Sequence, residues 1–374
     1  MKEGVYAQNF DKDPAHDLKR KVAELLTNER FHIDEADRKL FERQVRSDKR
    51  FVCVVGQHEE ADGTVERFLK IPVGPEEEID EPFQRQVLIT KFLEETGAIK
   101  TRGVIKYNFD RSSGQPFAIM ETFRKGEAKI GFIAGHDDME LLTAKEAEST
   151  IDNLEALQSI NLYTASPEVR DILQKIEYDY EGLSAGIKEN IRERITALDS
   201  PPDGEEYHEV LNRRLRVENF KEKVDRLIEH WRQVLSAEDN KGKYLMHGDL
   251  APGNMYIYDN GEVEFVDWEW AGVANNKAIA TIIDYGNCRA RAWNNPEYRE
   301  ALDNALIERY QRRGQENLGR AIVSLGILRS HMGLAGFFEN YDLETQRKES
   351  ERRRRESTEA DIEKAWKIAG LKLE

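Results

Sequence analysis

The residues best suited to chemistry lie in one short stretch of the chain. It reads His247-Gly248-Asp249-Leu250-Ala251-Pro252-Gly253-Asn254 and is followed by Asp267-Trp268-Glu269. Asp249 is expected on a loop, where its carboxylate could accept the proton of a substrate hydroxyl. Asn254 and Asp267 supply an amide and a carboxylate oxygen, the kinds of ligand that bind Mg²⁺. A catalytic base beside two metal ligands is the arrangement that enzymes use for phosphoryl transfer.

A predicted β-hairpin brings the two oxygen ligands together. An apolar run at 255–258 precedes Asp259-Asn260-Gly261, and a second β-prone run follows at 263–266. Asp and Asn before Gly between two such runs are a strong hairpin signal. In an antiparallel hairpin the start of the first strand lies roughly 5 Å from the end of the second. Asn254 and Asp267 are therefore expected to face the same point in space.

This arrangement resembles the catalytic loop and metal-binding strand of the aminoglycoside phosphotransferase and choline/ethanolamine kinase superfamily. The resemblance implies that Asp249 is the catalytic base, that Asn254 and Asp267 hold Mg²⁺, and that ATP is the phosphate donor. It also implies that His247 orients the loop. Gly248, where protein kinases carry Arg, and Asp-Trp-Glu in place of Asp-Phe-Gly favour the small-molecule branch. The alternative is that these are ordinary turn and strand-end residues brought together by chance.

The same resemblance implies an α+β fold with two lobes, as in protein kinases. The smaller N-terminal lobe would contain an antiparallel sheet, and the larger C-terminal lobe would be mostly helical. We place the nucleotide-binding lobe, with a leading helix that Asp13-Pro14 can open, at 1–124. The C-terminal lobe, 125–374, would hold the catalytic loop, an acceptor-site insertion at 162–243 and a charged C-terminal helix.

Lys70 matches the lysine that binds the ATP phosphates in this fold. It lies in a β-prone run at 65–71, after similar runs at 40–45 and 51–56, and has apolar neighbours. The alternative is a solvated lysine on an edge strand. No glycine-rich phosphate loop precedes it, because 46–50 contains no glycine. Ser47 and nearby backbone amides are the candidates to cover the phosphates.

A helix is predicted at 83–96, closed by Gly97, in the position that supplies an acidic partner for the lysine. The sequence departs from the family here, because the best register places Gln86 opposite Lys70. A glutamine can accept a hydrogen bond from the lysine but cannot neutralise it. Glu81 or another acid is the alternative partner.

The strand predicted at 116–123 resembles the hinge that binds adenine. The resemblance implies that backbone groups of Glu121, Thr122 and Phe123 would hydrogen-bond the base. The alternative is an ordinary edge strand. Because the strand stands between the 83–96 helix and the long helical half, its position favours the hinge.

The C-terminal half is predicted to be helical. Apolar residues at helical spacing predict a helix over 143–161, and the 325–338 segment reads as a core helix. Asp284 lies in a segment that resembles choline kinases, and the resemblance implies that it chiefly braces the catalytic loop. The mixed charges of 342–364 predict a helix that faces solvent or a partner.

Aromatic residues near the predicted site suggest how a cationic substrate could bind. They are Trp268, Trp270, Tyr285 and Trp293, and rings attract a quaternary ammonium by about 0.5–2 kcal/mol each. Glu269, Trp270 and Trp293 are therefore possible substrate contacts. The alternative, common at such spacing, is that the rings belong to the core. An amino alcohol is favoured over an aminoglycoside because of the segment around Asp284.

Composition narrows the partners. The 374 residues carry a net charge of −16, which disfavours nucleic-acid binding and favours a cationic substrate. Two cysteines, no signal pattern and no apolar run that could span a bilayer predict a cytoplasmic protein without disulfides or a membrane segment. The sequence as a whole predicts an ATP- and Mg²⁺-dependent kinase of a small hydroxyl-bearing molecule. The alternatives are an inactive pseudokinase that serves as a scaffold and an atypical protein kinase.

Overall fold

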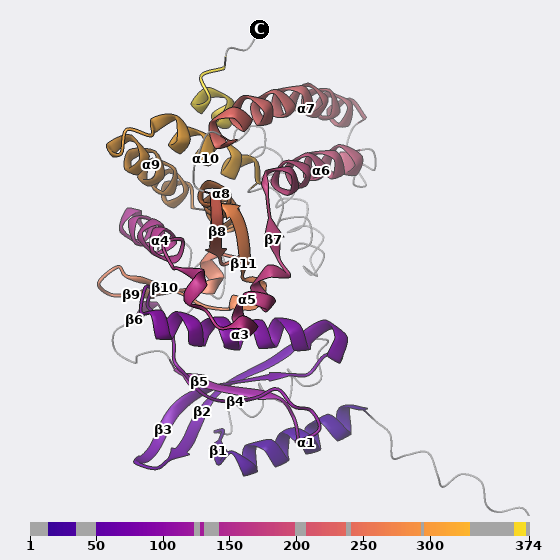
Figure 1. Cartoon of the computed structure of the whole chain (residues 1–374). Helices are drawn as coiled ribbons and strands as arrows, with labels where there is room; N and C mark the ends of the chain where they lie inside the picture. Colours follow the sequence, from indigo (N-terminus) through magenta and orange to yellow (C-terminus); the bar gives the residue numbers. More distant parts are fainter. Residues whose placement is uncertain are drawn as a thin grey trace, which may run out of the picture. The chain divides into compact units, whose positions relative to one another are not determined.

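The computed structural model shows an α+β protein that divides into two compact units, Met1–Gly126 and Glu127–Glu374 (Figure 1). An antiparallel sheet dominates the first unit and helices dominate the second, which confirms the predicted fold class. The structure describes residues 14–34, 50–122, 128–130, 142–198, 207–236, 241–292, 295–329 and 363–371. The strand predicted at 40–45, Ser47, Phe123 and Trp293 lie outside these residues.

The first unit contains a five-stranded antiparallel sheet in the order β1-β2-β3-β5-β4. Its strands are β1 (Phe31–His32), β2 (Phe51–Glu60), β3 (Gly63–Pro72), β4 (Val104–Asn108) and β5 (Phe117–Glu121). The long hairpin of β2 and β3 pairs Glu60 with Gly63 at its turn and Phe51 with Pro72 at its open end. This hairpin sets the position of Lys70, which pairs with Cys53.

Two helices cover opposite faces of this sheet (Figure 1). Helix α1 (Pro14–Asn28) buries Val22 and Leu25 against one face, and α3 (Glu76–Thr96) buries Phe83 and Val87 against the other. The faces separate because alternate residues of a strand point to opposite sides. In β5, accordingly, Ile119 packs with α1, whereas Ala118 packs with α3.

Helix α3 begins earlier than the predicted 83–96 and runs through Pro82. Proline usually ends a helix because it lacks the N–H that bonds the carbonyl four residues back. Here that carbonyl belongs to Glu78, and the Arg50 guanidinium donates to it at 3.1 Å. Acidic side chains in the first turn also complement the helix dipole. The helix ends as predicted at Gly97, whose φ is 62°.

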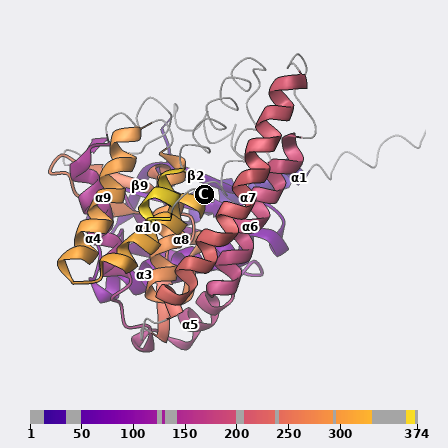
Figure 2. The same cartoon turned by 90° about the horizontal axis from the view of Figure 1, so that it is seen from above.

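The second unit contains the helices α4 (Ala144–Leu157), α5 (Pro167–Gln174), α6 (Tyr180–Leu198), α7 (Tyr207–Ser236), α8 (Lys277–Arg291), α9 (Pro296–Arg312) and α10 (Glu316–Arg329), and residues 363–368 are helical as well. Helices α6 and α7 lie side by side (Figure 2). They make the described part of the 162–243 segment mostly helical, as predicted. The predicted core helix at 325–338 is described only as far as Arg329, where α10 ends.

Two small sheets complete the second unit. One has the order β10-β9-β6, from Val263–Phe265, Met255–Tyr258 and Ala128–Ile130. The other has the order β7-β11-β8, from Glu177–Tyr178, Gly272–Asn276 and Lys241–Met246. Strand β8 enters the 247–254 loop, and the β9–β10 hairpin leaves it, so these sheets position the candidate site.

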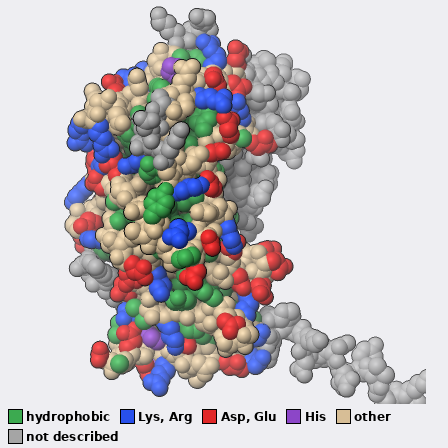
Figure 3. All heavy atoms as spheres, in the orientation of Figure 1, with side chains coloured by type: hydrophobic (Ala, Val, Ile, Leu, Met, Phe, Trp, Pro, Cys, Tyr) green, Lys and Arg blue, Asp and Glu red, His purple; other side chains and the backbone are tan. Residues whose placement is uncertain are grey.

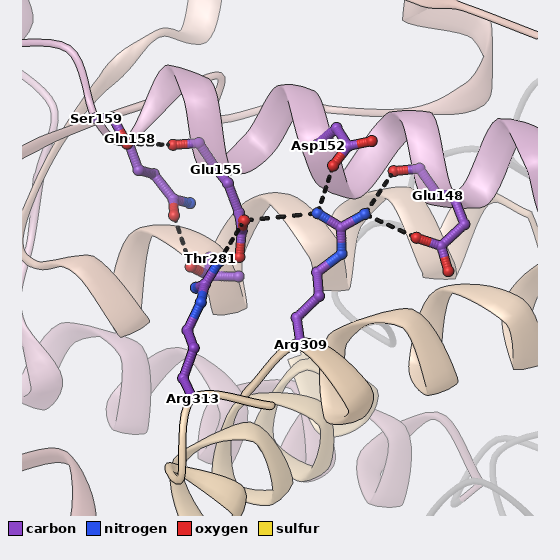
Figure 4. A network of polar contacts seen from close by, with 8 residues as sticks. All are labelled: Glu148, Asp152, Glu155, Gln158, Ser159, Thr281, Arg309 and Arg313. Carbon is purple, nitrogen blue, oxygen red and sulfur yellow. Dashed lines mark hydrogen bonds and ion pairs between the residues drawn. The ribbon is translucent and has the colours of Figure 1, made fainter. Parts of the chain in front are cut away.

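Ion pairs fasten α4 to α9 (Figure 4). The Arg309 guanidinium lies 2.7 Å from Glu148 and 2.6 Å from Asp152. Arg313, one turn further on, lies 2.7 Å from Glu155. These contacts join α9 to one acidic face of α4.

Residues 363–371 pack against α9, α10 and α7. Lys364 Nζ lies 2.7 Å from the buried carboxylate of Asp303, and Trp366 is buried with Arg226 over its ring. Most of the charged 342–364 segment lies outside the described residues. Of that segment the structure describes only Glu363, which is exposed, and Lys364, which is partly exposed and pairs with Asp303, so the helix predicted to face solvent or a partner stays a prediction.

Acidic and basic side chains alternate over the face shown in Figure 3, with apolar side chains scattered between them. Among the described residues, no helix combines the length and hydropathy that crossing a membrane requires.

Candidate active site

The predicted hairpin is present and places Asn254 and Asp267 at its open end. Strands β9 and β10 pair in the register Met255 with Phe265 and Ile257 with Val263. One step beyond, the Val266 amide donates to the Asn254 carbonyl at 3.0 Å. Asp267 follows directly, so the two expected metal ligands start from neighbouring backbone positions.

Asp267 has an unusual backbone conformation, with φ 68° and ψ 65°. Only Arg30 shares a positive φ among the described residues that are not glycine. The left-handed region costs a residue with a Cβ about 1–2 kcal/mol and persists only where the surroundings enforce it. Such strain concentrates at functional sites, so it supports the choice of Asp267 as a functional carboxylate.

His247 is a buried support of the loop. Its Nε2 lies 2.8 Å from the Val266 carbonyl and donates to it, while its ring lies 4.5 Å from that of Trp268. Burial lowers the pKa of His247, although the Val266 carbonyl and the charges of Asp249 and Asp267 oppose the change. A neutral imidazole that links the loop to the hairpin fits the orienting role implied by the resemblance.

Helix α8 holds the loop through three residues on one of its faces. Asp284 accepts hydrogen bonds from the amides of His247 and Gly248, both at 2.8 Å. Asn287, one turn on, donates to the Gly248 carbonyl at 2.7 Å. Arg291, a further turn on, lies 2.7 Å from Asp249 Oδ1. The spacing of three and then four residues places all three side chains on the same helical face.

Asp284 is fully buried, and this burial raises its pKa to about 7. The two loop amides and Arg329 act in the opposite direction because they favour the charged carboxylate. Both oxygens of Asp284 are committed to the loop backbone. With this geometry Asp284 could brace the loop, which is the role that the resemblance implies for it.

Gly248 allows the loop to pass close to the segment after Asp267. Its φ is 83°, and a Cβ at this position would lie 2.0 Å from the Trp270 carbonyl oxygen. Both the backbone conformation and the space therefore require glycine. The close approach of the Trp270 carbonyl therefore explains why this chain has Gly248 where protein kinases carry Arg.

Asp249 combines fixed orientation with access to solvent. Its side chain is 28% exposed, and its Oδ1 belongs to the ion pair with Arg291. Asn254 Nδ2 donates to the Asp249 carbonyl at 2.8 Å and lies 3.4 Å from Oδ2. Oδ2 is therefore the oxygen better placed to accept a proton from a substrate.

The residues at the hairpin suit Mg²⁺. Because Asn254 directs its amide nitrogen to Asp249, its amide oxygen remains as the donor for a metal, together with the Asp267 carboxylate. Within the described residues, no three His, Cys, Asp or Glu side chains are grouped to hold a metal ion. Two protein oxygens are the usual contribution to a Mg²⁺ ion that nucleotide phosphates and water complete.

The aromatic residues divide into core and surface. Trp268 and Tyr285 are buried, at 1% and 0% exposure, so the core interpretation holds for them. Trp270 is 43% exposed, and its indole N–H donates to Glu269 at 3.1 Å. Of the possible substrate contacts, Glu269 and Trp270 thus contact each other just beyond Asp267 and Trp268.

In the first unit, Lys70 and Gln86 meet. The Lys70 ammonium donates to Gln86 Oε1, and Lys70 is only 5% exposed. Glu81, considered as the alternative partner, pairs with Arg85 at 2.6 Å. The structure therefore brings together the two residues that the sequence had paired by register.

The strand proposed as the hinge is β5. The Glu121 amide donates to the Gly103 carbonyl at 2.9 Å, and the Thr122 hydroxyl donates to the Glu66 carbonyl at 3.1 Å. The Glu121 N–H already donates to Gly103. The carbonyl of Glu121 is therefore the backbone group of this residue that could contact adenine.

Sequence reasoning missed Asn287 and Arg291. Their spacing from Asp284 was a usable signal, because residues three and seven positions further along a helix share its face. Nothing in the sequence, however, fixed which face of α8 meets the loop.

No protein-family model matches the chain, and no curated protein matches it in sequence. Solved structures do share its fold. An aminoglycoside phosphotransferase from Alicyclobacillus acidocaldarius has 13% sequence identity and a TM-score of 0.50, with 91% of this chain and 92% of that chain covered. The chain therefore has the fold of the aminoglycoside phosphotransferases, which confirms at the level of fold the resemblance seen in the loop and hairpin.

Two further solved structures match less closely. The AMP-bound spectinomycin phosphotransferase has 13% identity and a TM-score of 0.48, with 88% of this chain and 98% of that chain covered. An ethanolamine kinase from Plasmodium vivax has 12% identity and a TM-score of 0.42, with 96% and 90% covered.

Proposed function

We propose that this protein is a phosphotransferase that moves the γ-phosphate of ATP to a hydroxyl of a small molecule, with Mg²⁺ as the metal. One observation carries the proposal. Arg291 holds the carboxylate of Asp249 and Asn254 holds its backbone carbonyl, beside the hairpin end where Asn254 and Asp267 begin. A fixed base next to two magnesium-type ligands on this fold serves phosphoryl transfer best.

The proton would pass to Asp249. As the substrate hydroxyl attacks the γ-phosphorus, its O–H bond breaks and Oδ2 of Asp249 accepts the proton. The bond between the γ-phosphorus and the β–γ bridging oxygen breaks, and ADP leaves. Oδ2 has this role because Arg291 occupies Oδ1. The contribution of the protein is mostly positioning and electrostatic stabilisation.

The remaining roles concern the nucleotide. Asn254 and Asp267 would hold Mg²⁺, which neutralises phosphate charge. Lys70 would bind the α- and β-phosphates, and the backbone of 121–123 would contact adenine. Since the Glu121 N–H is engaged by Gly103, this residue would contribute its carbonyl.

The acceptor would be a cationic alcohol, either an amino alcohol or an aminoglycoside. The exposed ring of Trp270 and the carboxylate of Glu269 suit a positive charge, and the Trp270 backbone lies against Gly248, the residue before Asp249. The net charge of −16 would attract such a molecule at long range. The helical 162–243 segment would shape the acceptor pocket.

The test is ADP release from Mg-ATP across a panel of amino alcohols, aminoglycosides and sugars. Wild type is compared with Asp249→Asn, which keeps the shape of the side chain but removes its basicity. Asp259→Asn, in the exposed hairpin turn, is the matched control. Stimulation by one acceptor class that is lost in the first variant and kept in the second would support the proposal.

Nucleotide binding provides the opposing result. Failure of Mg-ATP to bind in a calorimetric titration of the wild-type protein would overturn the kinase proposal. The scaffold interpretation would then replace it.

A further inference from the structure

Lys70 has a second neighbour besides Gln86. Its Nζ lies 4.2 Å from the centroid of the Phe51 ring. A cation within about 6 Å of a ring centroid is attracted by the negative face of the ring, and the attraction grows when water is excluded. With Lys70 only 5% exposed, this contact is largely shielded from solvent.

The Phe51 ring is placed by the hairpin and by α3. Phe51 begins β2, two residues before Cys53, which is the partner of Lys70 on β3. This puts Phe51 diagonally across from the lysine on the same face of the sheet, within reach of a long side chain. The ring also lies 6.4 Å from the ring of Phe83 on α3.

The same face of α3 therefore acts on Lys70 in two ways. Gln86 accepts its hydrogen bond, and Phe83, one turn earlier, packs against the ring that covers its ammonium. Residues three apart on a helix are neighbours on its surface. Gln86 accepts a hydrogen bond from the ammonium, whereas the aromatic face attracts the positive charge itself.

We propose that Phe51 is a positioning residue for nucleotide binding, which holds the Lys70 ammonium by a cation–π contact. The inference builds on the proposed function, because it assigns Lys70 to the phosphates of ATP. The ring keeps the lysine extended and charged without competing with the nucleotide for it. Phe51 thus shares with Gln86 the orienting task that an acidic side chain performs elsewhere in this fold.

The alternative is that Phe51 only packs, since it borders the cluster formed by Phe83, Val87, Ala118 and Met120. Fluorinated phenylalanines separate the two roles. Stepwise fluorination weakens the negative ring face but keeps the shape and apolar character of the ring. The same substitutions at Phe68, which borders the same cluster, provide the matched control.

The experiment measures Mg-ATP affinity by calorimetry, which needs no acceptor. We expect the Kd for ATP to rise with each added fluorine at Phe51, by about 2- to 30-fold in total, with little change in unfolding temperature. That range corresponds to a cation–π energy of about 0.5–2 kcal/mol. Phe51→Tyr and Phe51→Trp should retain affinity, whereas Phe51→Leu should lose it.

Two outcomes count against the inference. An ATP affinity that is insensitive to fluorination at Phe51 but falls in Phe51→Leu would leave packing as the only role. If the wild-type protein binds no ATP, the proposed function fails and the nucleotide role of Phe51 fails with it. NMR distinguishes these cases, because the ring over Lys70 should shift its side-chain proton resonances upfield in the wild type without any nucleotide.

Discussion

The Arg291 guanidinium lies 2.7 Å from the Asp249 carboxylate, at the end of the helix that also binds the loop backbone. Both the position of the loop and the orientation of its acid therefore depend on α8. A base that is held from a helix moves less than one on an unsupported loop. For proton transfer, which needs the acceptor within hydrogen-bond reach, this restriction favours reaction.

Replacing Arg291 should impair turnover more than nucleotide binding. In Arg291→Met the carboxylate of Asp249 loses its anchor, and we expect kcat to fall by about 10- to 100-fold with little change in the KM for ATP. Arg313→Met, which removes an ion pair to Glu155 at the far end of α9, should leave kcat unchanged.

Steady-state kinetics with added guanidinium chloride test whether the charge itself matters. Guanidinium should restore part of the activity of Arg291→Met and none in Asp249→Asn. Wild-type kcat in Arg291→Met would refute the anchoring role.

Asp284 should make stability depend on pH. Its pKa is about 7 in the folded protein against 3.8 for an ordinary carboxyl, so the folded state binds the proton more tightly. The stability that this provides is complete below about pH 4 and is lost as the pH rises through about 7. The slope is at most about 1.4 kcal/mol per pH unit.

Urea unfolding between about pH 5 and about pH 8 measures this effect. Asp284→Asn should be less stable than wild type because an amide nitrogen cannot accept from the loop amides. Its deficit should shrink as the pH rises, since only the wild type has a proton to lose. A deficit that stays constant with pH would show that Asp284 is ionised throughout, and Asp259→Asn serves as the exposed control.

Gly248 should tolerate no side chain. Gly248→Ala adds about 1–2 kcal/mol of backbone strain and also the clash with the Trp270 carbonyl. Gly314→Ala is a matched control, because Gly314 has φ 73° and no atom within 4 Å of an added Cβ. Unfolding free energies should show a clearly greater loss for Gly248→Ala, and ADP release should fall in that variant alone. Equal losses would mean that the loop adjusts.

Gln86 should control ATP affinity through Lys70. Gln86→Leu removes a hydrogen bond to a charged group, worth about 1.5–3 kcal/mol, and should raise the Kd for ATP by about 10- to 100-fold. Gln86→Glu keeps an acceptor and should stay within about threefold of wild type. Gln115→Leu, which removes a hydrogen bond to the Pro72 carbonyl in the same unit, should not affect binding. Calorimetric titration measures the Kd for ATP of each variant and of the wild type. Equal affinities in all four proteins would contradict a role for the Lys70–Gln86 hydrogen bond in ATP binding.

The local parts of the site could be predicted from sequence. Turn chemistry at Asp259-Asn260-Gly261 determines the hairpin, and the hairpin determines where Asn254 and Asp267 begin. The pairing of Lys70 with Gln86 could be predicted from the order of the strand and the helix in the chain. These relationships depend on residues close together in the chain, or on one helix whose register the sequence specifies.

The non-local parts could not be predicted in the same way. Arg291 reaches Asp249 only because α8 docks with one particular face toward the loop. The sequence predicted that the helix begins at 83, after Pro82, whereas α3 begins at Glu76. Proline usually ends a helix, but here the Arg50 guanidinium, which is remote in sequence, satisfies the Glu78 carbonyl. Trp268 and Tyr285 could be taken for ligand-binding rings because aromatic residues have the same spacing in a core.

The docking of residues 363–371 has a consequence for how the protein is made in the cell. The carboxylate of Asp303 binds Tyr285 and Arg289 of α8 and also Lys364. Because translation proceeds from the N-terminus, Lys364 and Trp366 leave the ribosome after every other residue of that cluster. Until they emerge, Asp303 lacks its ion pair with Lys364, and Arg226 lacks the ring of Trp366. This part of the fold is therefore completed only once the chain has been synthesised past Trp366.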